Sequence, residues 1–263
     1  MFFKRKTKKR AGAKPKTLVF VDFEHWYISL DKQFHQKPDI RAWKNKLSEE
    51  FDVDEIYFFA DFSNQYIQNE VPKIREVTNF IIETGSKSQF HKKDFTDFIM
   101  LDRIYLTAFD RDDIDLYIIF SGDGHFSSVV RFLVTKKHAD VGIYGIKDSV
   151  SHQLRSSATW VRELPSADDL MKAYYRAILG NLNYLENDIK NGKIHHPTFK
   201  ATVEAVTKHY RMDYASVRLA LQELIDNSYI KQTEVLLGNN SIRELVVDWN
   251  KVISDGIWSE NKY

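Results

Sequence analysis

The chain has 263 residues, a mass of 30.9 kDa and a formal net charge of +1, with 43% hydrophobic and 29% charged residues. This balance is typical of a globular protein, and the length suffices for one large domain or two ordinary ones. Cysteine is absent, which excludes disulfides and thiolate metal sites. No apolar run reaches the roughly 18 residues of a membrane span. The basic N-terminus lacks the apolar segment of a secretory signal, so we expect a cytoplasmic protein.

The small net charge conceals an uneven distribution along the chain. Residues 1–16 contain eight basic residues and no acidic residue. Residues 17–170 contain 18 basic and 26 acidic residues, a net charge of −8, and residues 171–263 contain 12 basic and 11 acidic residues. The first segment is polar and aperiodic, so we expect it to be disordered and either to bind phosphates, of RNA or of another anionic surface, or only to aid solubility. The residues predicted to contact RNA are Lys4, Arg5, Lys6, Lys8, Lys9 and Arg10.

Strands and helices are expected to alternate from residue 17 to residue 164. Short apolar, β-branched runs predict strands, and apolar residues at steps of three and four predict helices. Strands are expected at 17–22, within 53–60, and at 79–83, 114–120, 141–146 and 160–162. Helices are expected after residue 23, after residue 63, over 92–108, near 126–137 and around 151–157. This alternation predicts an α/β fold with a mainly parallel, Rossmann-like sheet and helices on both faces.

The pattern changes near Ala167. Helices are expected over 168–190, from 196–198 through 209 and after 213–216, followed by two strands over 229–247 joined at Gly238-Asn239-Asn240. This order predicts a smaller α+β, winged-helix-like domain over 167–263, which follows the α/β domain over 17–166. The third helix has Arg218 against Glu223 and Asp226, so contact with RNA or protein is favoured over sequence-specific DNA binding. A packing role or a homodimer contact is the alternative.

Three acidic residues are predicted at one edge of the sheet. Asp22 ends the first strand, Asp97 begins the helix before the fourth strand, and Asp123 follows the fourth strand in Ser121-Gly122-Asp123-Gly124. The first and fourth strands of such a sheet flank the point where strand order reverses, and ligands bind there. We therefore expect the three carboxylates to converge, although Asp123 or Ser121 can equally serve as a helix cap.

Converging carboxylates repel one another and raise one another's pKa unless a cation neutralises them. Oxygen ligands without cysteine favour Mg²⁺ or Mn²⁺, and such an ion can bind a phosphate and activate water. The sequence thus predicts phosphodiester hydrolysis, with Asp22, Asp97 and Asp123 as metal ligands and catalytic residues. Asp102 lies about 140° around the helix from Asp97, so it is assigned to the rim or to orienting a ligand.

Residues 17–164 resemble the NYN domain family, relatives of the PIN-like ribonucleases. The resemblance depends on three motifs, supported by Gly142-Ile143-Tyr144-Gly145 and by Ser151 to Leu154 with Ala158. The motifs are Val19-Phe20-Val21-Asp22-Phe23-Glu24-His25, Thr96-Asp97-Phe98-Ile99-Met100-Leu101-Asp102 and Ser121-Gly122-Asp123-Gly124-His125-Phe126. The resemblance implies a Rossmann-like sheet and metal-dependent RNA cleavage. It implies that Asp22, Asp97 and Asp123 are the family's acids, with Asp102 and Ser121 as secondary residues.

The sequence departs from the family pattern at two histidines, which are also secondary site residues. His25 stands where the family often has Asn, and His125 where it often has Asp. Imidazole can bind a metal or move a proton, with a preference shifted towards Mn²⁺ or Zn²⁺. The same replacements also fit a lost activity, so the alternative is a weak or inactive RNA-binding or scaffold protein on this fold.

A third reading is a phosphohydrolase of the haloacid dehalogenase type, because Asp22 ends the first strand. That class needs a second Asp two residues later, where Glu24 stands, and a late catalytic Lys, which is not evident. It is therefore the least favoured of the three functions, since fold-level analogy is weak support.

Overall fold

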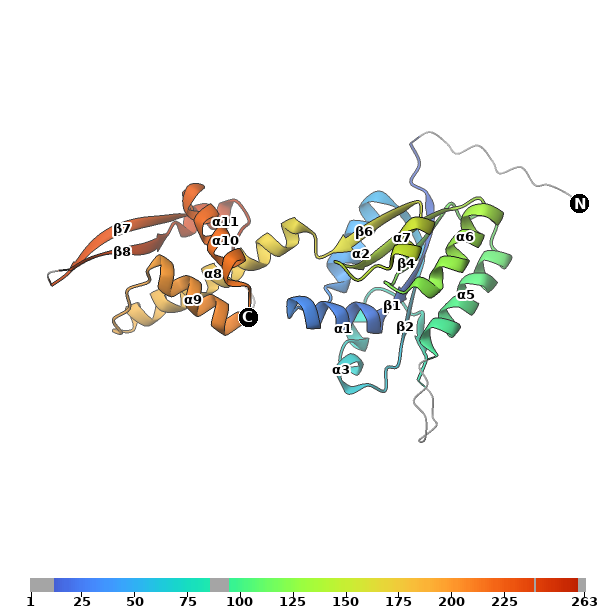
Figure 1. Cartoon of the computed structure of the whole chain (residues 1–263), viewed down its shortest axis with the longest axis horizontal. Helices are drawn as coiled ribbons and strands as arrows, with labels where there is room; N and C mark the ends of the chain where they lie inside the picture. The colour runs from blue at the N-terminus through green and yellow to red at the C-terminus, as the bar shows by residue number, and fades with distance from the viewer. Residues whose placement is uncertain (1–11, 86–94, 239, 260–263) are drawn as a thin grey trace, which may run out of the picture. The chain divides into compact units, whose positions relative to one another are not determined.

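The structure is a computed structural model that describes residues 12–85, 95–238 and 240–259 (Figure 1). The described chain divides into two compact units, one ending at Leu164 and the other beginning at Pro165. The six basic residues predicted to contact RNA, between Lys4 and Arg10, lie outside the described residues. Among the described helices, none is both long and apolar enough to cross a lipid bilayer.

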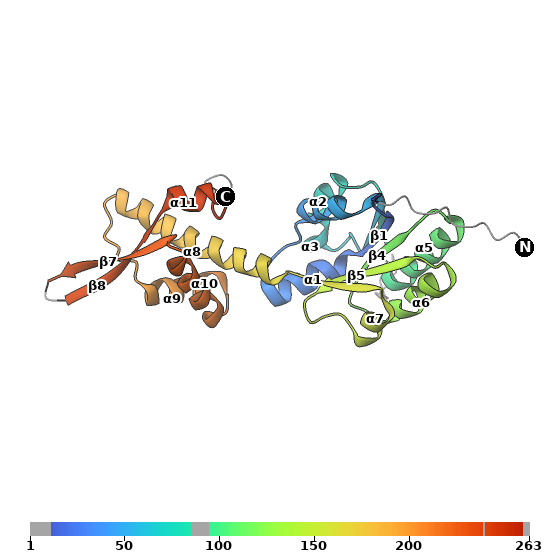
Figure 2. The same ribbon diagram turned by 90° about the horizontal axis from the view of Figure 1, so that it is seen from above.

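The described part of the first unit forms a six-stranded sheet in which every strand is parallel to its neighbours (Figures 1 and 2). The strand order is β3-β2-β1-β4-β5-β6. The strands are β1 (Lys16–Asp22), β2 (Asp52–Ala60), β3 (Ile81–Glu83), β4 (Leu116–Phe120), β5 (Asp140–Ile146) and β6 (Trp160–Leu164). The predicted α/β fold is confirmed, and strand order reverses between β1 and β4. Val21 pairs with Phe120, which brings the carboxyl ends of β1 and β4 side by side.

Helices cover both faces of this sheet. One face carries α1 (Phe23–Phe34), α2 (Ile40–Glu50), α3 (Gln65–Gln68) and α4 (Val71–Arg75). The other carries α5 (Thr96–Asp110), the 3₁₀ turn η1 (Gly124–Phe126), α6 (Ser127–Lys136) and α7 (His152–Ser157). Side chains alternate along β1, so Val19 and Val21 join the first core while Leu18 and Phe20 join the second. The helical stretch expected after residue 63 is two short helices, and α2 was not predicted.

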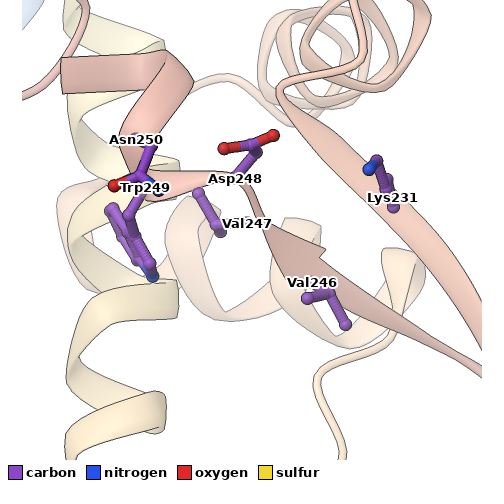
Figure 3. Close-up of a pocket in the computed structure, with 6 residues that line it drawn as sticks. All are labelled: Lys231, Val246, Val247, Asp248, Trp249 and Asn250. Carbon is purple, nitrogen blue, oxygen red and sulfur yellow. The ribbon is translucent and has the colours of Figure 1, made fainter. Parts of the chain in front are cut away.

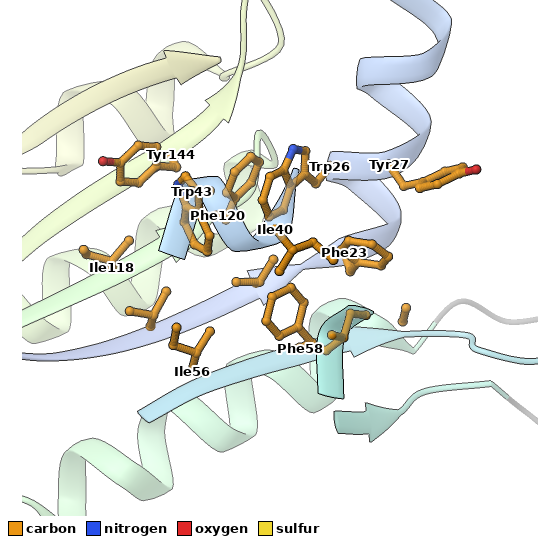
Figure 4. Packing of buried hydrophobic residues seen from close by; sticks show 14 of the residues in the cluster. Phe23, Trp26, Tyr27, Ile40, Trp43, Ile56, Phe58, Ile118, Phe120 and Tyr144 are labelled. Atoms are coloured by element: carbon orange, nitrogen blue, oxygen red, sulfur yellow. The ribbon is translucent and has the colours of Figure 1, made fainter. Parts of the chain in front are cut away.

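An aromatic core lies under the carboxyl end of β4 (Figure 4). Phe120 stacks on Trp26 with 4.3 Å between ring centroids, and the Trp43 ring meets Phe120 edge-on at 5.5 Å. All three rings are buried. Side chains that interlock at this density have little room to move. They therefore fix the residue from which the turn to Asp123 departs.

The second unit, over the described ranges 165–238 and 240–259, combines helices with a β-hairpin. Its elements are α8 (Ala167–Lys190), α9 (Phe199–Tyr210), α10 (Tyr214–Asp226), β7 (Ile230–Leu237), β8 (Asn240–Val247) and α11 (Trp249–Ser254). The two strands are antiparallel, paired from Ile230↔Val247 to Leu237↔Asn240. Leu179, Val203 and Leu221 bring the three long helices into one buried core. The predicted order of helices followed by a hairpin is present, with α11 as an addition.

Candidate metal centre

Two acidic residues and one histidine meet beyond the carboxyl end of β4. One ligand atom from each of Asp97, Asp123 and His125 lies within 4.8 Å of the other two. His125 Nδ1 is 3.1 Å from Asp123 Oδ1 and 3.8 Å from Asp97 Oδ2. The side chains of Asp97 and Asp123 are 33% and 41% exposed, and that of His125 is 77% exposed. The group is thus open to solvent and compact enough for its members to share one cation.

The first turn of α5 places Asp97 in this group. Thr96, immediately before it, is buried, and its hydroxyl forms a 2.6 Å hydrogen bond with that of Thr84, which follows β3. Met100 and Ile104 continue the buried face of the helix at steps of four residues. The start of α5 is therefore held against the sheet both by this hydrogen bond and by the buried side chains. These contacts keep Asp97 at the edge of the sheet.

The turn after β4 fixes Asp123 through two hydrogen bonds. Asp123 Oδ1 accepts a bond from the backbone N–H of His125 at 2.8 Å, which caps η1. The Asp123 backbone N–H donates to Ser121 Oγ at 3.2 Å. The capping role expected as the alternative for Asp123 is therefore real. It is compatible with metal binding, because the same bond holds the carboxylate beside His125.

Gly122 lies where this turn passes His25 and the loop after β5. A Cβ atom at Gly122 would lie 2.4 Å from Ser149 O and 2.7 Å from His25 Cε1, so no side chain fits. Such close approach of backbone to its neighbours requires glycine. The glycine thus allows the turn to pack directly on the histidine from α1.

The His25 ring is held in one protonation pattern by Ser149. Ser149 Oγ donates to Ile146 O at 2.7 Å, and His25 Nε2 lies 3.2 Å from the same Oγ. Because the hydroxyl has one proton, His25 Nε2 must be the donor, which leaves the lone pair on Nδ1. Burial lowers the pKa of His25, and the nearby charge of Asp123 partly opposes this effect. His25 is therefore a neutral imidazole at pH 7.

Asp22 lies beside the group of three but is not a member of it. Its Oδ1 accepts a 3.0 Å bond from the His25 backbone N–H and so caps α1. Its Oδ2 accepts a 3.4 Å bond from Ser121 Oγ, and Ser121 also contacts Asp123. The structure thus joins Asp97 and Asp123 through His125 and links Asp22 to them through Ser121. The prediction that Asp22 is itself a ligand stays a prediction.

Asp102 is exposed on α5 and also lies outside the group of three. Its assignment to the rim of the site or to orienting a ligand stays a prediction. Asp97 belongs to the group of three and Asp102 does not, because a separation of five residues turns the two side chains to different sides of a straight helix.

A cavity of about 440 Å³ lies in the second unit, at the base of the hairpin (Figure 3). It is lined by Lys231, Val246, Val247, Asp248, Trp249 and Asn250. The lining comes from β7, β8 and α11, whereas the carboxylates belong to the first unit. This cavity is therefore no part of the candidate metal centre.

The sheet is parallel, its strand order reverses between β1 and β4, and carboxylates lie at that point. These features place the protein in the class of Rossmann-like α/β proteins with a candidate metal centre. The family model of the NYN domain matches residues 16–164, more than half of the chain, and the chain belongs to this family. The resemblance inferred from the motifs is confirmed.

A solved structure of a protein of unknown function from Vibrio parahaemolyticus RIMD 2210633 is similar in fold. It is 20% identical, with a TM-score of 0.52, and the match covers 60% of this chain and 98% of that one. At this identity the likeness supports the fold alone. No curated protein matches the chain at a significant level.

Proposed function

We propose that the protein is a divalent-metal-dependent ribonuclease that hydrolyses RNA phosphodiesters at Asp97, Asp123 and His125. Its NYN domain supports a nuclease fold and a nucleic acid substrate. The observation that carries the proposal is the convergence of two carboxylates and one imidazole within 4.8 Å at the edge of the sheet where such folds bind ligands.

The donor atoms fit Mg²⁺ or Mn²⁺. Carboxylate oxygens suit both ions, and the imidazole of His125 moves the preference towards Mn²⁺. Asp97, Asp123 and His125 would hold the ion, and Asp22 is proposed as a further acidic partner next to Ser121. When bound, such an ion offsets phosphate charge and lowers the pKa of a water molecule. The protein's own part is to orient the phosphodiester and to hold the carboxylates in place.

The second candidate function is an RNA-binding or scaffold protein without catalysis. It is favoured by the position of His125, whose Nδ1 lies between the Asp97 and Asp123 carboxylates. An imidazole N–H there can donate a hydrogen bond to a carboxylate, which removes part of the need for a cation. The two functions therefore differ in whether the site takes up metal.

Purified protein incubated with mixed single-stranded and structured RNA in Mg²⁺, Mn²⁺ or EDTA tests the nuclease proposal. We expect cleavage with either metal and none with EDTA, together with saturable Mn²⁺ binding by titration calorimetry at pH 7.5. Lack of both cleavage and Mn²⁺ binding contradicts the nuclease proposal and supports the scaffold.

We expect deletion of residues 1–11 to flatten the salt dependence of RNA binding without changing the order of preference among RNA sequences. The deletion removes six positive charges but spares Lys14 and Lys16, which contact Ser48 and Asp113. Each lost phosphate contact reduces the slope of log K against log salt by about 0.7 for single strands. Fluorescence anisotropy from 50 to 300 mM salt measures the slope, and a variant with glutamine at the six positions controls for length. An unchanged slope removes this role.

We further propose that residues 167–263 form a winged-helix-like module that positions RNA. The separate core of the second unit implies that a chain ending at residue 164 keeps the core of the first unit. We expect this shorter chain to bind Mn²⁺ like the full chain and to bind RNA more weakly. Calorimetry and anisotropy measure the two affinities, and unchanged RNA affinity assigns the module to a protein contact instead.

A further inference from the structure

Phe98 is a large apolar side chain that faces solvent next to the candidate metal centre. It follows Asp97 in the first turn of α5, and 70% of its surface is exposed. Phe95, three residues earlier, is 40% exposed. Phe95 is the N-cap of α5, and a spacing of three places the two residues on the same side of the helix start.

The Phe98 ring takes no part in the buried core of the first unit. Two residues correspond to about 200° around a helix, so Phe98 and the buried Met100 lie on nearly opposite sides of α5. No ring contact joins Phe98 to another residue in the described part of the chain. By contrast, Tyr105 on the same helix packs on Phe132 at a centroid distance of 5.1 Å.

Exposure alone carries no conclusion, because single exposed apolar residues are common. Phe109 on the same helix is 83% exposed and is far from the centre along the helix. What distinguishes Phe98 is its position one residue after Asp97, about 100° around the helix from it, which places the ring beside the metal centre rather than in it. An exposed ring beside a site for phosphate can add an attraction that does not depend on charge, because it can stack on a base.

We propose that Phe98, flanked by Phe95, stacks on an unpaired base of the RNA whose phosphate lies at the metal centre. The inference depends on the proposed ribonuclease function and assigns Phe98 to substrate binding. Every base has an aromatic face, so stacking adds affinity without selecting a sequence. A base can stack on a side chain only when it has left its own helix, so the site disfavours duplex RNA.

The test uses the full chain in EDTA, with a labelled six-nucleotide single-stranded RNA, so that binding is measured without cleavage. We expect Phe98→Leu to weaken binding about 5- to 150-fold, the range of losing one stacked base. Phe98→Tyr keeps an aromatic face and should bind within about twofold of the parent. Phe109→Leu is the matched control, an equally apolar change about 16 Å along the helix, and should leave the affinity unchanged.

RNA with an abasic nucleotide at each position in turn tests stacking directly. The loss caused by Phe98→Leu should disappear at one abasic position, because that RNA no longer has the base that the ring holds. Three results each overturn the inference: binding by Phe98→Leu within twofold of the parent, the same loss in Phe109→Leu, or the same loss at every abasic position. Thermal unfolding of each variant checks that it is folded.

Two outcomes separate this inference from the proposed function. If the parent cleaves RNA in Mn²⁺ and Phe98→Leu binds and cleaves like it, stacking is wrong and the ribonuclease proposal stands. If the parent never cleaves but Phe98→Leu alone loses affinity, stacking stands and the ribonuclease proposal is wrong.

Discussion

Replacing Asp123 by Asn is expected to abolish RNA cleavage and to weaken Mn²⁺ binding while the protein stays folded. Asn keeps the shape of Asp and an oxygen that can accept the 2.8 Å bond from the His125 N–H, so the turn is preserved. It removes the negative charge that the cation needs. Loss of an outer partner of a metal ligand reduces affinity about 10- to 100-fold, and loss of a ligand itself should exceed this.

Stability and RNA binding should survive the same change. Without metal, one charge fewer relieves the repulsion between Asp97 and Asp123, so the unfolding midpoint should be unchanged or slightly higher. RNA affinity in EDTA should persist, since phosphate contacts come mainly from basic groups. Asp110→Asn is the control, because Asp110 is exposed at the far end of α5 and lies outside the group. An Asp123→Asn variant that cleaves as fast as the parent in Mg²⁺ or Mn²⁺ ends the nuclease proposal in favour of the scaffold.

The sheet could be predicted because each strand is recognisable from its own residues. Leu116 to Phe120 is apolar throughout and is buried throughout, as expected for a strand covered on both faces. The helix α2 also had evidence that the prediction overlooked. Asp39 accepts a bond from the Ala42 N–H as its cap, and Ile40, Trp43 and Leu47 are buried at steps of three and four.

The meeting of Asp97 with Asp123 was predictable from topology, since both lie at the edge where strand order reverses. The contacts that set the details of the site were not. The bonds between Thr84 and Thr96 and between His25 and Ser149 join loops that have no shared sequence pattern. The position of Asp22 depends on its role as a cap and on Ser121, 99 residues away. Such contacts depend on side-chain orientations that periodicity does not specify.

Gly122→Ala is expected to destabilise the first unit by about 1–3 kcal/mol, the range for overpacking a well-packed site. The added Cβ would lie 2.4 Å from Ser149 O, a backbone atom. This loop can move little, because the Ser149 N–H donates to Ile146 O at 2.9 Å and the Ser151 N–H donates to Gly122 O at 2.9 Å. Relief of the clash must therefore disturb the bond between His25 and Ser149 or shift Asp123. Urea unfolding measures the loss of stability. Titration calorimetry with Mn²⁺ measures the affinity for metal, which we expect to be weaker.

Gly124→Ala, two residues along the same turn, is the control. The atoms nearest to an added Cβ are Ser151 Oγ at 3.1 Å and Gln153 Oε1 at 3.3 Å, both side-chain atoms and both farther away than Ser149 O is from a Cβ at Gly122. Neither glycine has a positive φ, so both alanine variants keep an allowed backbone and differ only in the space around the new methyl group. We expect Gly124→Ala to change the free energy of unfolding by less than about 1 kcal/mol. If the two variants lose equal stability, the close approach at Gly122 is not what requires glycine. If Gly122→Ala has the same free energy of unfolding and the same affinity for Mn²⁺ as the parent, the packing of the turn on His25 does not position Asp123.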